Sequence, residues 1–526
     1  MSKLSFSRNP DRVLGKKVEY RKKSTIAAGL AIIFLFLISG LVASPRAFAF
    51  ANGQSASIVL GQPNFVLRNV STTQNGLNDP YNIAFDSHGD LWVADASNSR
   101  ILEFAPPFST DEAASIVLGV PNFTSTSDVC FATTVVNPSC LDVPQGLAFD
   151  SSGDLWVSDT SSNRILEFTT PFSNGENASM VLGMENFTTG AISDTPPSQS
   201  DLDTPWGLTF DSSGNLWVAD SGYNRVLEFK TPFSIGEAAS TVLGQDNFTA
   251  GINANYPGCA LGQACPTASS LQDPSDVKFD SSGDLWVADT TPFRILEFKA
   301  PFSNGMSASL VLGEPDFTTY RSGSVVGCEV VPSASCTQPY ALAFAKSGTL
   351  WVADADFSRV LAFNPPFTND ENASIVLGQP NFTSSPLSGT QNATATDMST
   401  PTGIALDPSG NVWVSDSTDN RVLEFSASTV GSSTSSSSSS STSTSVTSSS
   451  STSTSHSISS TTIIPPTTST ASTQSATPVV TSSSHASSSS SSTSITPNYL
   501  AVVAVVGVVM VGTFVLVRRR GSPTRK

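Results

Sequence analysis

The stretch Leu91-Trp92-Val93-Ala94-Asp95 decides the fold, because it is the first of six closely similar copies. The pattern Leu-Trp-Val-Ala/Ser-Asp recurs around Trp156, Trp217, Trp286 and Trp351, and a sixth copy reads Val412-Trp413-Val414. The intervals between successive tryptophans are 64, 61, 69, 65 and 62 residues. A nearly constant period of this kind predicts a repeat architecture.

Each repeat contains four short runs that are rich in β-branched and aromatic residues and bounded by Gly, Pro, Asp or Ser. In the first complete repeat they are residues 82–86, 91–95, 100–104 and 115–119. Such runs are typical of β-strands. The link Asp-Ser-x-Gly-Asp/Asn between the first two runs predicts a tight hairpin with Gly at a positive φ. Helical periodicity is absent, so each repeat is predicted to be a four-stranded antiparallel sheet.

Six such sheets predict an all-β fold, a six-bladed β-propeller. A lone copy of the fourth run, residues 57–61, precedes the first complete repeat, and the last repeat stops after its third run at residues 421–425. We therefore expect residues 57–60 to form the outer strand of the final blade. This pairing would close the ring and hide the sheet edges that an open array exposes. A solenoid would not need two complementary truncations.

The second repeat reads PQGLAFD at 144–150, GDLWVSD at 153–159 and NRILEF at 163–168, and it resembles the NHL repeat. The resemblance extends over residues 56–425 and implies a propeller with a binding role. It does not imply one reaction, because one fold hosts many functions. Phe293 and Ser358 stand where the family pattern has Asn, and Ala345 replaces the Asp that ends the first strand. The repeats are also longer than is usual, because the fourth-to-first connections are long.

The two ends of the chain predict export and membrane anchoring. Residues 26–43 are an uncharged run between a basic stretch and Ala47-Phe48-Ala49, so residues 1–49 are expected to be a cleaved signal peptide, with an uncleaved N-terminal anchor as the alternative. A second apolar run predicts a transmembrane helix over residues 498–517, followed by a basic cytoplasmic tail over 518–526. The Ser/Thr-rich residues 426–497 are typical of a disordered, O-glycosylated stalk. We thus expect a single-pass cell-membrane protein with the propeller, residues 50–425, outside the cell.

The charge distribution excludes one class of partner. Residues 50–517 contain 12 basic and 41 acidic residues, a net charge of −29. A domain so acidic repels phosphate backbones, so no nucleic acid is expected as a partner.

Six cysteines fit an exported protein, and each pair lies inside one connection between predicted strands. The expected disulfides are Cys130–Cys140, Cys259–Cys265 and Cys328–Cys336, the shortest loops among fifteen connectivities. Zinc binding is a weak alternative, because there is no CxxC and His88 is the only histidine between residues 50 and 425. Candidate N-glycosylation sites are Asn69, Asn122, Asn177, Asn186, Asn247, Asn372, Asn381 and Asn392, although such sequons also occur by chance.

A repeated Asp/Arg pair is the most conspicuous charged feature of the blades. The pairs are Asp95/Arg100, Asp159/Arg164, Asp220/Arg225, Asp289/Arg294, Asp354/Arg359 and Asp416/Arg421. A catalytic group is rarely needed six times around a ring, so we interpret these pairs as braces of the second-to-third strand turns. The six repeated Trp, and the Phe of the type Asn122-Phe123, are interpreted as core between blades.

Function is expected where the repeats differ, around the mouth of the central channel. The residue after the repeated Pro that opens each innermost strand is Tyr81, Gln145, Trp206, Ser275, Tyr340 or Thr402, and its neighbour is Asn82, Gly146, Gly207, Asp276, Ala341 or Gly403. The three aromatic residues fall on alternate blades, where they could stack on sugars, hold a peptide, or pack beneath the loops. The candidate ligand-binding residues are Tyr81, Asn82, Gln145, Trp206, Asp276 and Tyr340.

The sequence lacks the catalytic residues that most enzymatic functions of a propeller would need. One histidine cannot supply the metal site of propeller lyases that act on amidated-peptide precursors, paired cysteines leave no thiol nucleophile, and no Gly-x-Ser-x-Gly occurs. A calcium site as in gluconolactonase-like propellers stays open, with Asp276 and Asn82 as candidate oxygen ligands.

We therefore expect a monomeric, non-catalytic protein that needs no cofactor and binds an extracellular protein, peptide or glycan. A calcium-dependent hydrolase or lactonase is the second reading, and a structural envelope component is the third.

Overall fold

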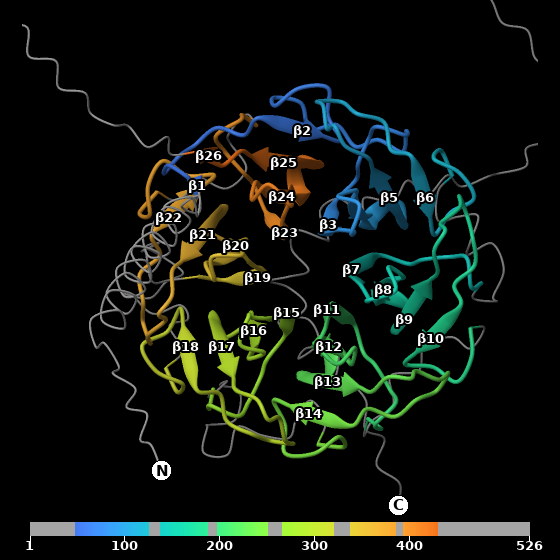
Figure 1. Ribbon diagram of the computed structural model, residues 1–526, viewed down its shortest axis with the longest axis vertical. Coiled ribbons are helices and arrows are strands. Elements are labelled where there is room, and N and C mark those ends of the chain that lie inside the picture. Colours follow the sequence, from blue (N-terminus) through green and yellow to red (C-terminus); the bar gives the residue numbers. More distant parts are fainter. Residues whose placement is uncertain are drawn as a thin grey trace, which may run out of the picture. The chain divides into compact units, whose positions relative to one another are not determined.

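The computed structural model describes residues 48–125, 137–187, 197–250, 266–319, 337–384 and 393–429. The chain divides into two compact units, residues 1–436 and 437–526, and every described residue belongs to the first. Six four-stranded antiparallel sheets follow one another around a ring, as Figure 1 shows.

Each sheet is one blade, and its strands run from the central channel outward in chain order. Blade 1 contains β3 (Pro80–Phe85), β4 (Leu91–Asp95), β5 (Arg100–Phe104) and β6 (Ile116–Leu118), and blade 2 contains β7 (Pro144–Phe149), β8 (Leu155–Asp159), β9 (Arg164–Phe168) and β10 (Met180–Leu182). Blade 3 contains β11 (Pro205–Phe210), β12 (Leu216–Asp220), β13 (Arg225–Phe229) and β14 (Thr241–Leu243), and blade 4 contains β15 (Pro274–Phe279), β16 (Leu285–Asp289), β17 (Arg294–Phe298) and β18 (Leu310–Leu312). Blade 5 contains β19 (Pro339–Phe344), β20 (Leu350–Asp354), β21 (Arg359–Phe363) and β22 (Ile375–Leu377). Blade 6 contains β23 (Pro401–Leu406), β24 (Val412–Asp416), β25 (Arg421–Phe425) and the N-terminal β2 (Ile58–Leu60). Short 3-10 helices follow the second strand of four blades: η1 (Ala96–Asn98), η2 (Thr160–Ser162), η3 (Ser221–Tyr223) and η4 (Ser417–Asp419).

The predicted closure of the ring is confirmed. In β2, Ile58, Val59 and Leu60 pair antiparallel with Glu424, Leu423 and Val422 of β25. Val59 and Leu60 are fully buried, so the strand completes the core as well as the sheet. The innermost strands of blades 6 and 1, β23 and β3, also contact each other, so the two ends of the propeller meet.

The closing segment begins earlier in the chain than the sequence predicted. The Phe50 ring lies 4.8 Å from the Trp351 ring, edge to face, as the Phe108 ring lies 4.7 Å from that of Trp413. Asn52 accepts a hydrogen bond from the backbone N–H of Val376 at 3.0 Å. Still nearer the N-terminus, β1 (Phe48–Ala49) pairs with β26 (Ser428–Thr429), although residues 48 and 49 belong to the predicted signal peptide. Residues 50–60 therefore supply blade 6 with the parts that the other blades contain in continuous sequence.

The core lies between neighbouring blades. Trp92 of blade 1, for example, packs against Phe149 and Phe172 of blade 2, with ring centroids 5.8 and 4.7 Å apart. Five of the six repeated tryptophans are completely buried and the sixth, Trp351, is 3% exposed, which confirms their prediction as inter-blade core. Residues of the Phe123 type are partly buried at the edges of these clusters.

The six Asp/Arg pairs are buried braces, as the sequence indicated. In blade 3 the Arg225 Nε–Asp220 Oδ2 distance is 2.7 Å, and both side chains are inaccessible to solvent. Arg225 also donates to the carbonyl oxygens of Phe248 and Asp201, and Asp220 accepts from the backbone N–H of Asp203. All six pairs are closed in the same way. Each pair thus fastens the fourth-to-first connections to the second-to-third strand turn of its blade.

Several predictions fall on residues outside those described. They are the signal peptide before residue 48, the stalk beyond residue 429, the transmembrane helix over 498–517 and the tail over 518–526. Within the described part of the chain, no helix has the length and apolar character needed to span a bilayer.

Candidate functional site

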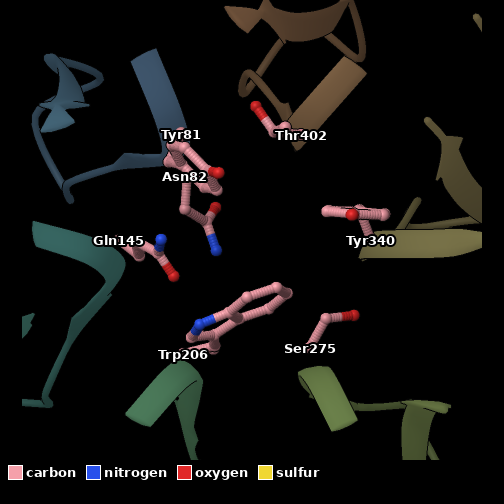
Figure 2. A pocket seen from close by; sticks show the side chains of 8 residues that line it. Tyr81, Asn82, Gln145, Trp206, Ser275, Tyr340 and Thr402 are labelled. Atoms are coloured by element: carbon pink, nitrogen blue, oxygen red, sulfur yellow. The ribbon is translucent and has the colours of Figure 1, made fainter. Parts of the chain in front are cut away.

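Side chains from all six blades meet at the mouth of the central channel, on the face that carries the second-to-third strand turns. Each innermost strand starts there with Pro, paired with the Asp that ends the second strand, for example Pro80 with Asp95. The space is lined by Tyr81, Asn82, Gln145, Trp206, Gly207, Ser275, Tyr340 and Thr402 (Figure 2). It contains about 240 Å³ of empty volume, including solvent at the opening. We call these eight residues the mouth.

Five of the six predicted ligand-binding residues meet here: Tyr81, Asn82, Gln145, Trp206 and Tyr340. Asp276 is not among the lining residues, whereas Gly207, Ser275 and Thr402 are. The position in the repeat pointed to Ser275 and Thr402, but their small side chains gave no reason to choose them.

A β-bulge just after the Pro aims these side chains at the channel. Between Pro80 and Ile83 the register with β4 shifts, so Tyr81 and Asn82 both stand outside the regular ladder. Between Pro274 and Asp276 the shift leaves only Ser275 unpaired, and Asp276 pairs with Ala288. Bulges commonly redirect side chains next to functional sites. Asn82 lines the mouth, and the equivalent Asp276 does not.

Asp276 is occupied within the wall of the propeller. Its carboxylate accepts hydrogen bonds from Lys278 Nζ at 2.7 Å and from the backbone N–H groups of Val277 at 2.9 Å and Leu342 at 2.8 Å. Gly207 leaves room for this arrangement, since a Cβ there would lie 2.2 Å from Asp276 Oδ1. Burial raises the pKa of Asp276, and the Lys278 ammonium opposes the rise. The carboxylate bonds blade 4 to blade 5 and is not placed to serve as a ligand in the mouth.

The aromatic side chains of the mouth form a half-buried surface. The rings of Trp206 and Tyr340 are 5.8 Å apart and inclined by 33°. Tyr81 is half-buried at the mouth as well (Figure 2). Among the described residues, none of these three side chains has a hydrogen-bond partner, so the two hydroxyls and the indole N–H are available to a ligand.

The amide oxygen of Gln145 lacks a hydrogen-bond partner in the described part of the chain, whereas the hydroxyls of Ser275 and Thr402 have one. Gln145 is only 8% exposed, and its Oε1 is buried without a hydrogen-bond partner. Figure 2 shows its amide pointing into the space between Asn82 and Trp206. Asn82 Oδ1 accepts from the backbone N–H of Ile83 at 2.8 Å, whereas Ser275 and Thr402 donate to backbone carbonyls of the next blade at 3.2 and 3.0 Å. A buried acceptor without a donor costs about 1–3 kcal/mol, so the Gln145 oxygen would gain from a ligand that donates to it.

Four acidic residues stand just before the innermost strands of blades 1–4, and the sequence analysis did not predict a role for them. Asp79 and Asp273 directly precede the Pro of their strands, and Asp142 and Asp203 stand one residue earlier. We call these four residues the acidic lip. None of them forms an ion pair among the described residues. Their signal in the sequence is an Asp one or two residues before the Pro that opens a first strand, in blades 1–4 only.

The lip is held in an unusual backbone conformation. The residues immediately before the Pro in blades 1–4, Asp79, Val143, Thr204 and Asp273, have φ between 50° and 55°. Non-glycine residues in this region cost of order 1–3 kcal/mol and cluster at functional sites. Burial raises the pKa of Asp79 and Asp142 to about 6, and it also raises that of Asp203 and Asp273.

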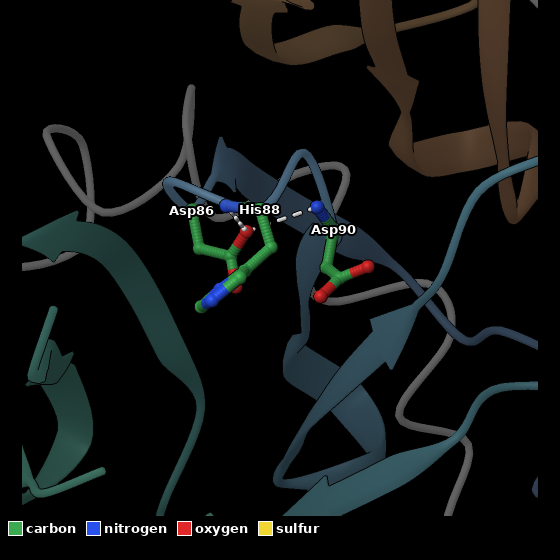
Figure 3. A group of neighbouring side chains, drawn as sticks. All are labelled: Asp86, His88 and Asp90. Atoms are coloured by element: carbon green, nitrogen blue, oxygen red, sulfur yellow. Dashed lines mark hydrogen bonds and ion pairs between the residues drawn. The ribbon is translucent and has the colours of Figure 1, made fainter. Parts of the chain in front are cut away.

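Three clusters of acidic side chains on the opposite face lie at the hairpin turns between first and second strands. Figure 3 shows Asp86, His88 and Asp90, where Asp86 Oδ1 accepts the backbone N–H groups of His88 at 2.8 Å and Asp90 at 3.0 Å. The other two groups are Asp150/Asp154/Glu167 and Asp280/Asp284/Glu297, built on the same turn. Gly at positive φ closes each turn, as predicted. Because the leading carboxylate is occupied by the backbone, we assign no metal site there.

The predicted modification sites are only partly within the described residues. Cys140 is the only described cysteine and is not free, while the five others lie outside. Seven of the eight sequon asparagines, all but Asn392, are described and exposed. In Asn122 and Asn381 the side-chain oxygen accepts from the Thr two residues later, and Asp316 makes the same bond without being a sequon. A structural turn therefore suffices to explain the repeated Asn-Phe-Thr, and glycosylation and the three disulfides stay predictions.

Comparisons with known proteins agree on the repeat. The NHL repeat pattern matches residues 141–168, 202–229 and 398–425, which contain the three inner strands of blades 2, 3 and 6. No curated protein matches the chain. The chain thus carries NHL repeats on a six-bladed β-propeller.

Solved structures with some similarity include streptogramin B lyase, at 12% identity and a TM-score of 0.38, covering 69% of this chain and 96% of that one. Virginiamycin B lyase from Staphylococcus aureus aligns at 12% identity and a TM-score of 0.35, covering 66% and 94%. A catalytically inactive form of that lyase with quinupristin aligns at 12% identity and a TM-score of 0.37, covering 68% and 97%.

Proposed function

We propose that this protein is a cell-surface binding protein whose propeller mouth receives an extracellular protein, peptide or glycan without chemical conversion. The observation that carries this proposal is the contrast between repeated and unrepeated positions. The ion pairs and the Trp core are nearly identical in all six blades, while the six residues after the Pro differ in type and converge on one half-open space. A site that departs from the repeat only there supports a specific recognition role.

The chemistry of the mouth favours binding over catalysis. Its eight residues carry no carboxylate, imidazole, thiol or ammonium group. The hydroxyls of Ser275 and Thr402 donate to backbone carbonyls and have no base beside them. The aromatic surface and the unsatisfied Gln145 amide, in contrast, are groups that gain free energy from a ligand.

The calcium-dependent reading is less well supported. Of its two candidate ligands, Asp276 is bonded to Lys278 and to two backbone N–H groups, and Asn82 Oδ1 already accepts a backbone N–H. Calcium takes six to eight oxygen ligands. The described residues of the mouth do not offer such a set.

The binding proposal is tested with peptide and glycan arrays probed by the full-length protein, with and without calcium. We expect ligands that the wild type retains and Trp206→Ala loses, while His88→Gln on the opposite face behaves as wild type. Equal binding by wild type and Trp206→Ala would place recognition elsewhere. The absence of any ligand would favour a structural envelope component.

The proposed location rests on the sequence of the two ends. Protease treatment of intact cells should release a propeller fragment, because the predicted Ser/Thr-rich stalk would be cleaved before the packed ring. Protection of the propeller until the cells are lysed would contradict this topology.

A further inference from the structure

Building on the proposed binding function, we propose that the mouth binds the cationic end of its ligand, an ammonium or guanidinium group such as a lysine or arginine side chain carries. The aromatic surface and the unpartnered Gln145 oxygen share one small space, and two carboxylates of the acidic lip, Asp79 and Asp273, act electrostatically on its tyrosines. Each of these features favours a compact cation that donates N–H groups.

Among the described residues, no basic side chain forms an ion pair with the acidic lip, although Arg164 and Arg225 lie near enough to oppose the rise that burial causes in the pKa of Asp142 and Asp203. The only charged residues on the six innermost strands are Asp276 and Lys278, which pair at 2.7 Å and cancel each other. Arg68 is engaged with Asp419 at 3.7 Å. The four carboxylates of the acidic lip therefore set the sign of the local potential. A cleft lined by one sign of charge attracts counter-ions of the other.

The negative charge of nearby carboxylates also affects the pKa of the two tyrosines of the mouth. Burial raises the pKa of Tyr81 well above its usual value, and the Asp79 carboxylate adds to the rise. Burial likewise raises the pKa of Tyr340, with contributions from Asp356 and Asp273. Negative charge close to these hydroxyls favours a positive ligand over an anionic one.

The aromatic surface supplies an attraction that a cation gains and a simple alcohol does not. A cation within about 6 Å of a Trp or Tyr ring centroid gains about 0.5–2 kcal/mol, more when it is partly desolvated. Trp206 is the strongest such ring type, and Tyr340 and Tyr81 share the same space (Figure 2).

Gln145 provides the directional contact. Its Oε1 is an acceptor without a donor, and the amide points into the mouth. An ammonium or guanidinium N–H would satisfy this oxygen, and hydrogen bonds to charged donors are stronger than neutral ones. A carboxylate or phosphate would leave it unsatisfied and would also face the acidic lip.

The size of the mouth limits what enters it. The 240 Å³ of empty volume includes open solvent, and the room for the centre of a water-sized sphere is only about 10 Å³. That is about the room one water needs, so no more than the tip of one side chain enters unless the lining side chains move. A peptide or protein that inserts one Lys or Arg is the occupant we favour over a neutral glycan.

The test uses the full-length protein labelled with 5-fluorotryptophan, titrated with n-butylammonium chloride at pH 8 and matched ionic strength. The chain has seven tryptophans, and the Trp206 resonance is assigned by its loss in Trp206→Phe. We expect n-butylammonium to shift only this resonance, with a dissociation constant about tenfold lower than that of n-butanol. The other six resonances report that each variant remains folded.

Variants of Gln145 separate a cation site from a neutral one. Gln145→Glu should tighten n-butylammonium binding at least about threefold, because it places a negative charge beside the cation. Gln145→Met, which keeps the volume and removes the acceptor, should weaken binding by a similar factor. The double variant Asp79→Asn/Asp273→Asn should also weaken it, while the matched control Asp90→Asn, on the opposite face of blade 1, should not.

The results also separate this inference from the broader proposal. Equal affinity for n-butanol, or a Trp206 shift with methyl β-glucoside but not with n-butylammonium, would overturn the cation inference and leave a neutral binding site. Weaker binding by Gln145→Glu would overturn it as well. The binding function itself is judged by the arrays and falls only if wild type and Trp206→Ala cannot be distinguished there.

Discussion

Replacing Phe50 by Ala tests whether the N-terminal segment completes the propeller. Phe50 is half-buried and its ring lies 4.8 Å from that of Trp351. Fully burying a Phe side chain stabilises a protein by about 1.5–3 kcal/mol, and half of this is about 1 kcal/mol. The aromatic pair adds about 0.5–1.5 kcal/mol. We therefore expect Phe50→Ala to lower the free energy of unfolding by about 2 kcal/mol.

The chain contains a matched control for this change. Phe108 is also half-buried, and it packs on Trp413 at 4.7 Å within continuous sequence. Phe108→Ala should cost about the same as Phe50→Ala in urea unfolding followed by tryptophan fluorescence. A normal midpoint for Phe50→Ala beside a lowered one for Phe108→Ala would refute the role of the N-terminal segment in blade 6.

Three further changes test the packing and the electrostatics of the ring. Gly207→Ala should destabilise the protein by about 2–4 kcal/mol, because the added Cβ would lie 2.2 Å from Asp276 Oδ1; an unchanged melting temperature would contradict the tight blade contact. Asp220→Ala should cost about 3–5 kcal/mol in urea unfolding, because it leaves the buried Arg225 without its partner, and a cost below about 1 kcal/mol would be inconsistent with a brace. Burial raises the pKa of Asp79 from its ordinary value of 3.8 to about 6 in the folded protein. The folded protein therefore binds a proton more tightly than the unfolded chain, and its stability should increase as the pH falls from about 7 to 4. We expect an increase of about 1–2 kcal/mol after allowance for partial exposure. Asp79→Asn should flatten that part of the pH profile, and an identical profile in the two proteins would show that Asp79 does not titrate in this range.

The ring closure was predictable because it rests on chain order alone. An orphan fourth strand and a missing fourth strand require each other, and β2 and β25 pair in that register. Phe50 could have been found in the same way, since Phe50 stands eight residues before Ile58, as Phe108 stands eight residues before Ile116. Because the predicted signal peptide ends at residue 49, directly before Phe50, this second half of the pattern was not predicted.

The sequence predicted which positions of the repeat lie at the mouth, but not which side chains point into it. The residue after each Pro lies at the channel in every blade, because all six first strands start on one face. The next residue enters the mouth in blades 1 and 3, as Asn82 and Gly207, and does not do so in blade 4. Lys278, two residues after Asp276 on the same strand, is a local signal of its ion pair, whereas the bond from the backbone N–H of Leu342 comes from another strand.

An Asn that ends the second-to-third strand turn of the preceding blade braces the acidic lip in three of its four blades. Asn420, Asn163 and Asn224 end second-to-third strand turns, and their side chains accept the backbone N–H groups of Asp79, Thr204 and Asp273 in the next blade at 2.7–2.8 Å. This bond holds the residue before Pro at a positive φ. Phe293 and Ser358 replace the Asn in the turns that face blades 5 and 6, and neither Gln338 nor Thr400, the residues before Pro there, has a positive φ.

The acidic lip therefore depends on the blade interfaces and not only on its own residues. Where the Asn is present, the preceding blade fixes both the left-handed backbone and the position of the carboxylate beside it. Blade 2 faces Ser99 instead of an Asn, and Val143 still has a φ of 51°, so the Asn is not the only way to hold this conformation. Because the charge lies over blades 1–4 and Tyr340 stands on blade 5, the mouth is asymmetric within a nearly six-fold ring. A ligand would consequently be held in one orientation, its cationic end toward the lip and Gln145 and its apolar part against Trp206 and Tyr340.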